Sequence, residues 1–225
     1  MCRTKNSCTE LDIDPSKWNK ECLLPIPTFI TSEIEVFIKA TDLFFDGKKD
    51  ECLMLIESIK SKEMTDWYVE HGQMSGRQRR IGLNKKVPEK LAEELRDPVR
   101  SPARIQEAVF TRDGYRCRYC GAKLISQKFI KLFIEKLNSP FFRKGKDSKS
   151  IHGIIHLTWP VADHVVPWNL GGRTNLENLV SACAPCNYGK DGNTLEQLGL
   201  NNPFERAPLV DAWDGFVGRI EALKR

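Results

Sequence analysis

The sequence predicts an α+β protein: a mainly helical N-terminal region, then a part with strands, short helices and clustered cysteines. Three observations predict this. Apolar residues recur at helical spacing through residues 32–71. The stretch IIHLTWPVADHVV, residues 154–166, is rich in residues that favour strands. Two Cys-x-x-Cys pairs, Cys117/Cys120 and Cys183/Cys186, have the spacing of zinc ligands.

The bulk composition is that of an ordinary globular protein. The chain has 225 residues, of which 40% are hydrophobic and 29% charged, so it can build a core. No uncharged stretch is long enough to span a bilayer, and the start has no apolar segment typical of a secretory signal. We therefore expect no membrane association and a location in the cytoplasm. The eight cysteines would stay reduced there, which favours metal binding over disulfides.

Charge is distributed unevenly along the chain. The net charge is only +5, but residues 77–149 contain twenty Lys and Arg against eight Asp and Glu. A basic middle between more acidic flanks indicates a surface for a polyanion such as a phosphate backbone. The alternative is a set of solvated helix faces.

The N-terminal region, residues 1–100, is predicted to hold two helices. The first is expected to begin at Ser32, with Glu35 completing a capping box, and to end at Asp46-Gly47. The second is expected over residues 51–71. The basic, glycine-containing residues 72–90 are predicted to be a linker. The region carries no recognisable chemistry, so we expect it to serve targeting or partner binding.

The second part, residues 101–225, contains the cysteine pairs. Two matched pairs can supply four thiolates to one tetrahedral zinc ion, although 62 residues lie between them. Four unrelated buried cysteines are the alternative. The remaining cysteines lack ligand spacing and are expected to be small buried residues, with a second zinc site as the alternative; they are Cys2, Cys8, Cys22 and Cys52.

The order and spacing of three segments resemble a known family. YRCRYCG, ADHVVP and GGRTNLENLVSACAPCNYGK together resemble the HNH nuclease motif in its four-cysteine form, over roughly residues 109–193. Asn178 and Asn187 lie nine positions apart, and Asn187 directly follows Cys186, as in that motif. The resemblance implies a ββα-metal domain, in which a β-hairpin and a short helix surround one divalent ion, beside a structural zinc.

The residue types suit phosphodiester hydrolysis on chemical grounds. A neutral imidazole can accept a proton from water near neutral pH. Asp and Asn oxygens are hard ligands that suit Mg²⁺ or Mn²⁺. Adjacent residues on a strand point to opposite faces, so Asp163 could hold a metal while His164 faces water. Taken alone, Asp163-His164 could equally be a surface turn or an ion pair at a strand end.

The resemblance implies a role for each residue. His164 is expected to be the general base, and Asp163 and Asn187 the ligands of Mg²⁺ or Mn²⁺. Asn178 is expected to orient His164 through its side chain or its carbonyl. Phosphate contact is expected from Lys190, with a second candidate in Arg173.

One feature departs from the family pattern. Forty-two residues separate Cys120 from Asp163, where the family often has few. They include an insertion at about residues 124–150, which contains a predicted basic amphipathic helix around residues 129–137. This insertion could provide a DNA-facing surface, contact a partner, or only decorate the fold.

The resulting expectation is a metal-dependent HNH endonuclease that hydrolyses DNA. One site cuts one strand, so a double-strand break needs a homodimer, two sequential nicks or a second nuclease. Phage defence or restriction is the expected setting, with a partner protein bound through the N-terminal region. The first alternative is a non-catalytic, zinc-containing nucleic-acid-binding module. The second is an interaction protein whose N-terminal helices carry its activity.

Overall fold

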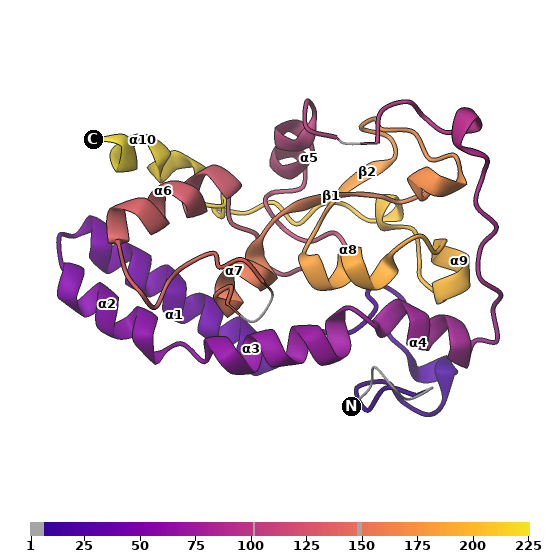
Figure 1. Ribbon diagram of the computed structural model, residues 1–225, viewed down its shortest axis with the longest axis horizontal. Coiled ribbons are helices and arrows are strands. Elements are labelled where there is room, and N and C mark those ends of the chain that lie inside the picture. Colours follow the sequence, from indigo (N-terminus) through magenta and orange to yellow (C-terminus); the bar gives the residue numbers. More distant parts are fainter. Residues whose placement is uncertain (1–6, 101, 148–149) are drawn as a thin grey trace.

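The structure is a computed structural model that describes residues 7–100, 102–147 and 150–225, and it is rich in helices (Figure 1). One antiparallel sheet pairs β1 (Val161–His164) with β2 (Leu179–Ala182). The α-helices of the described residues are α1 (Thr28–Phe45), α2 (Lys49–Ser58), α3 (Ser61–Trp67), α4 (Ser75–Gly82), α5 (Gln106–Arg112), α6 (Gln127–Leu137), α7 (Gly153–Thr158), α8 (Ala184–Lys190), α9 (Leu195–Leu198) and α10 (Ile220–Lys224). None of them is both long and apolar enough to cross a membrane. The mixed helix and strand content agrees with the prediction.

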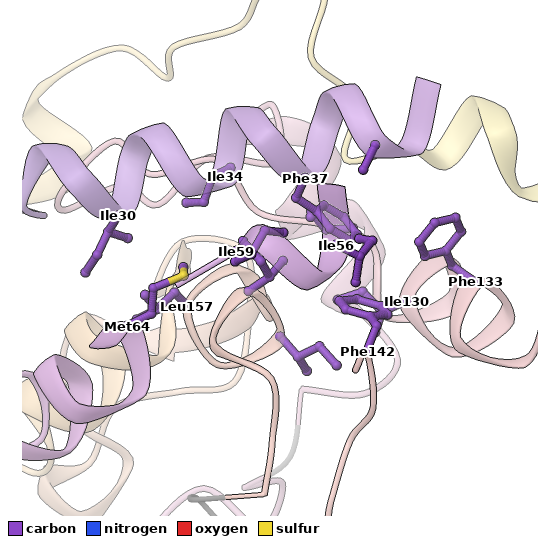
Figure 2. Packing of buried hydrophobic residues seen from close by; sticks show 14 of the residues in the cluster. Ile30, Ile34, Phe37, Ile56, Ile59, Met64, Ile130, Phe133, Phe142 and Leu157 are labelled. Atoms are coloured by element: carbon purple, nitrogen blue, oxygen red, sulfur yellow. The ribbon is translucent and has the colours of Figure 1, made fainter. Parts of the chain in front are cut away.

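The main hydrophobic core joins the N-terminal helices to the predicted insertion. Phe37 of α1 is fully buried, and its ring lies 5.0 Å from that of Phe142 and 5.8 Å from that of Phe133 on α6. Figure 2 shows α1 residues facing side chains of α6 and the segment after it. The core therefore contains residues from both sides of position 100. The division into residues 1–100 and 101–225 stays a prediction.

Helix α6 forms where the sequence predicts an amphipathic helix. Phe129, Ile130, Phe133 and Leu137 are buried along one side, and the helix ends at the left-handed Asn138. Burying this stripe favours the helix by roughly 1.5–3 kcal/mol per large apolar side chain. The opposite side carries exposed lysines.

The first predicted helix starts earlier than expected. Helix α1 begins at Thr28 after Pro27, and the Ser32 hydroxyl donates to the Thr28 carbonyl. Ser32 therefore lies inside the helix, and the predicted capping box with Glu35 is wrong. Proline suits the start because its fixed φ matches a helix entry and it needs no N–H partner there. The second predicted helix is also divided: α2 ends at Ser58, and α3 starts at Ser61 and continues into a π-helical turn, Tyr68–Gly72.

Two further segments differ from the prediction. The expected linker over residues 72–90 contains helix α4, and the expected strand-rich residues 154–166 begin with helix α7. All six residues of α7 are buried, so no polar face reveals helical periodicity in the sequence. The His152 imidazole caps α7 by accepting a hydrogen bond from the Ile154 N–H at 3.3 Å.

The hairpin that follows has a defined register. Asp163 pairs with Val180 and His164 with Leu179. The loop between the strands turns at Gly171, whose φ of +94° favours glycine. A Cβ at Gly172 would lie 1.8 Å from the Val166 carbonyl oxygen, so only glycine fits there. Helix α8 follows β2 after one residue and packs against β1.

Candidate functional site

The four predicted zinc ligands meet in one cluster. The Sγ atoms of Cys117, Cys120, Cys183 and Cys186 all lie within 4.8 Å of one another, and those of Cys120 and Cys183 are 3.6 Å apart. Tetrahedral zinc with Zn–S bonds of about 2.3 Å requires sulfurs about 3.8 Å apart. The cluster therefore fits a structural zinc ion.

Local structure explains why the pairs converge. After Cys117 the chain turns at Gly121, whose φ is +75°, and the Gly121 N–H donates to the Cys117 carbonyl at 2.9 Å. The second pair spans the start of α8, where Cys183 is the N-cap. The Arg118 N–H donates to the Ser181 carbonyl at 2.8 Å, which fixes the turn between Cys117 and Cys120 to β2.

The other cysteines form no comparable cluster among the residues that the structure describes. Cys8, Cys22 and Cys52 are buried, as expected of small apolar residues, whereas Cys2 lies outside the described residues. Burial is also the main reason that the pKa of Cys22 is raised to about 12.

Asp163 is a buried carboxylate at the end of β1. Its side chain accepts a hydrogen bond from the Tyr119 hydroxyl at 2.6 Å and lies 3.5 Å from the Lys190 ammonium. Burial raises the pKa of Asp163, and the Lys190 charge and the Tyr119 hydroxyl offset part of that rise. A divalent cation at this carboxylate would supply the charge compensation that burial demands.

His164 is half-buried next to it. Burial, reinforced by the nearby Lys190 charge, lowers the pKa of His164 to about 4. The imidazole is therefore neutral at pH 7, as a general base must be before it accepts a proton.

A threonine holds one nitrogen of this imidazole. His164 Nε2 lies 2.9 Å from Thr174 Oγ1, and the Thr174 hydroxyl donates its single proton to the Val99 carbonyl. Thr174 Oγ1 must therefore accept from an Nε2–H group, which assigns the proton to Nε2 and leaves the Nδ1 lone pair available. The Thr174 N–H in turn donates to Asp97 at 3.0 Å. Sequence reasoning missed this network because Val99 and Thr174 are far apart along the chain.

Asn178 organises the loop of the hairpin. Its amide donates to the carbonyls of Val166 and Arg173, and its oxygen accepts from the Val166 N–H at 2.8 Å. Its own carbonyl accepts from the Val165 N–H at 2.8 Å. Through Arg173 it holds the segment that leads to Thr174. Orientation of His164 by Asn178 stays a prediction, because Asn178 contacts Arg173, and it is the next residue, Thr174, that contacts the imidazole.

Four of the predicted residues line one cleft. Asp163, His164, Asn187 and Lys190 share a cavity of about 680 Å³, and Asn178 and Arg173 are not among its lining residues. Lys190 is only 1% exposed, and its ammonium donates to the His164 carbonyl at 2.7 Å. The Lys190 charge therefore stabilises the end of β1, and its expected contact with phosphate stays a prediction.

Comparison with known proteins bears on the same region. No curated protein and no solved structure gives a match to the chain. Residues 144–191, which include β1, β2 and α8, match the family model described as HNH endonuclease, which confirms over this segment the resemblance found in the sequence.

Proposed function

We propose that this protein is a metal-dependent HNH endonuclease that hydrolyses DNA phosphodiester bonds. The proposal rests on one observation above others: Asp163, His164 and Asn187 line the same cleft within the residues that match the family. In this proposal β1, β2 and α8 form the ββα unit, and the neighbouring four-cysteine cluster holds structural zinc.

Asp163 and Asn187 are the proposed ligands of Mg²⁺ or Mn²⁺. A carboxylate and an amide oxygen form a hard donor set, and Mg²⁺ commonly combines one or two such ligands with water and substrate phosphate. The bound ion would neutralise the charge that develops on the phosphate and leaving oxygens. The Tyr119 hydroxyl keeps the Asp163 carboxylate in position.

His164 is the proposed general base. Its Nδ1 lone pair takes a proton from the attacking water as the water oxygen bonds to phosphorus and the bond to the leaving oxygen breaks. Thr174 fixes the ring through Nε2, and the Lys190 bond to the His164 carbonyl fixes the backbone beneath it. Both contacts hold the imidazole before the substrate arrives.

Nicking of supercoiled plasmid with Mg²⁺ tests the proposal. We expect the natural protein to nick, and Asp163→Asn, which keeps the size of the side chain and removes its charge, to lose at least a hundredfold in rate. Asp191→Asn is the matched control, because Asp191 is an exposed carboxylate in the same cleft and asparagine, like aspartate, is among the residues that more often adopt a positive φ.

Two results would count against the proposal. Equal nicking by Asp163→Asn and the natural protein would refute the assigned metal site. DNA binding without Mg²⁺-dependent nicking by the natural protein would favour the non-catalytic zinc module.

A further inference from the structure

One wall of the cleft comes from outside the residues that match the family. It is formed by α4 and the extended chain after it, residues 73–100, which Figure 1 shows running along the edge of the molecule beside α8 and the hairpin loop. Five cationic side chains of this segment line the cleft that contains Asp163 and His164. They are Arg77, Arg80, Lys90, Arg96 and Arg100.

These five cations, termed here the cleft-wall cations, are not neutralised. None of them makes an ion pair with a carboxylate of the described residues. The guanidinium groups of Arg96 and Arg100 each lie 5.2 Å from the ring of Trp168, which positions them without cancelling their charge. Unpaired cations concentrated in one concave surface raise the local concentration of an anionic ligand.

The wall is held firmly against the candidate site. A Cβ at Gly76 would lie 2.0 Å from the Gly189 carbonyl oxygen, so α4 packs directly on α8. The buried guanidinium of Arg79 donates to carbonyls of Leu198, Cys22 and Leu23 at 2.7–3.2 Å. These contacts order α4 before any ligand binds.

The chain after α4 is also tied to the hairpin loop. The Leu91 N–H donates to the Asn169 carbonyl at 2.9 Å, and the Trp168 indole donates to the Asp97 carbonyl at 2.7 Å. The cations therefore keep a fixed position relative to His164, and less entropy is lost when a ligand binds.

We propose that the cleft-wall cations bind the phosphodiester backbone of the DNA strand on which the site acts. This inference rests on the proposed function and assigns substrate binding to residues 77–100. Helix α6 is the competing basic surface, but Figure 1 places it at the opposite end of the molecule from α4. The exposed lysines of α6 should therefore contribute little to binding at the cleft.

The test compares two triple variants of the full, zinc-loaded chain. Each removes three exposed positive charges. The cleft-wall variant is Arg77→Gln, Lys90→Gln and Arg100→Gln. The matched control on α6 is Lys128→Gln, Lys131→Gln and Lys136→Gln. Equal thermal midpoints of both variants and the natural protein would verify that the substitutions leave the fold intact.

Binding is measured by fluorescence anisotropy without Mg²⁺, on a labelled DNA duplex and on its single strand, over a range of salt concentrations. Log K for DNA binding falls with log [salt], and each lost phosphate contact reduces the magnitude of this salt slope by about 0.9 for duplex and about 0.7 for single strands. We expect the magnitude of the salt slope to be smaller by about 2 to 3 in the cleft-wall variant than in the natural protein. The α6 variant should keep the natural slope.

An unchanged slope in the cleft-wall variant, or a loss confined to the α6 variant, would overturn the inference. If the natural protein nicks DNA while the cleft-wall variant binds as well as the natural protein, only the inference fails. If the natural protein binds through the cleft wall but does not nick DNA, only the proposed function fails.

Discussion

His152 provides a sharp test of how the fold responds to pH. The side chain is 6% exposed, and its ring lies 5.0 Å from that of Phe142. Its Nδ1 caps α7 by accepting a hydrogen bond from the Ile154 N–H. Burial lowers the pKa of His152 to about 4. Protonation would place a charge in the core and remove the acceptor that caps the helix, so the folded state requires the neutral ring.

The sign and size of the effect follow from the two pKa values. The unfolded chain has the ordinary histidine value of about 6.5, so as pH falls toward 4 it binds a proton that the folded chain resists. The contribution of neutral His152 to the free energy of unfolding is complete above about pH 6.5 and is lost progressively below it. Between about pH 7.5 and about pH 5.5 the loss amounts to about 1.4 kcal/mol in the free energy of unfolding.

Urea unfolding of the natural protein and of His152→Asn at both pH values measures this loss. Asparagine keeps a side-chain acceptor for the cap but does not titrate. We expect the variant to be less stable at the higher pH, because it loses ring packing, and to lose about 1.4 kcal/mol less than the natural protein on acidification. Parallel pH dependence in the two proteins would refute the reasoning.

Three further perturbations test the site and its support. Thr174→Val should lower the hydrolysis rate constant kcat about tenfold with little change in KM, because His164 loses its partner at Nε2. Thr174→Ser keeps the hydroxyl and should restore the rate. A normal kcat in Thr174→Val would contradict the proposed orientation of His164. Gly76→Ala should cost about 1–3 kcal/mol in urea unfolding, because its Cβ would meet the Gly189 carbonyl, and an unchanged midpoint would show that α4 packs more loosely. Metal analysis should find one zinc ion per chain, and Cys186→Ser should lose that zinc together with several kcal/mol of stability; retention of zinc by the variant would count against the four-cysteine site.

The cysteine cluster could be predicted because its signal is local and chemical. Each Cys-x-x-Cys pair folds into a ligand turn by itself, and thiolates in such pairs favour a shared metal. The buried stripe of α6 could be predicted for a similar reason, since one apolar side repeats at helical spacing.

Features that depend on distant contacts could not be predicted. Helix α4 contains Gly76 and the buried Arg79, which resemble linker residues in the sequence. Only the folded chain shows that Gly76 packs against α8 and that Arg79 donates to the Leu198 carbonyl. The Tyr119 bond to Asp163 and the Thr174 bond to His164 also join separate parts of the chain. Single-residue patterns carry no record of such pairings, because only the tertiary fold brings the partners together.

The distribution of charge along the sequence indicates a surface for a polyanion, but it does not show where on the folded protein that surface lies. The basic middle of the sequence predicts a polyanion surface without distinguishing α4 from α6. The structure separates them: the cleft-wall cations face the candidate site, whereas the exposed lysines of α6 lie on a helix at the other end of the molecule (Figure 1).

The most direct test of the central claim is Mg²⁺-dependent plasmid nicking by the natural protein and by His164→Ala under single-turnover conditions. A positioned general base contributes roughly 10²–10⁴ in rate, so the account predicts a loss of that size with unchanged DNA binding and zinc content. Nicking by His164→Ala within tenfold of the natural rate would contradict the assignment of His164 as the group that takes the proton from water.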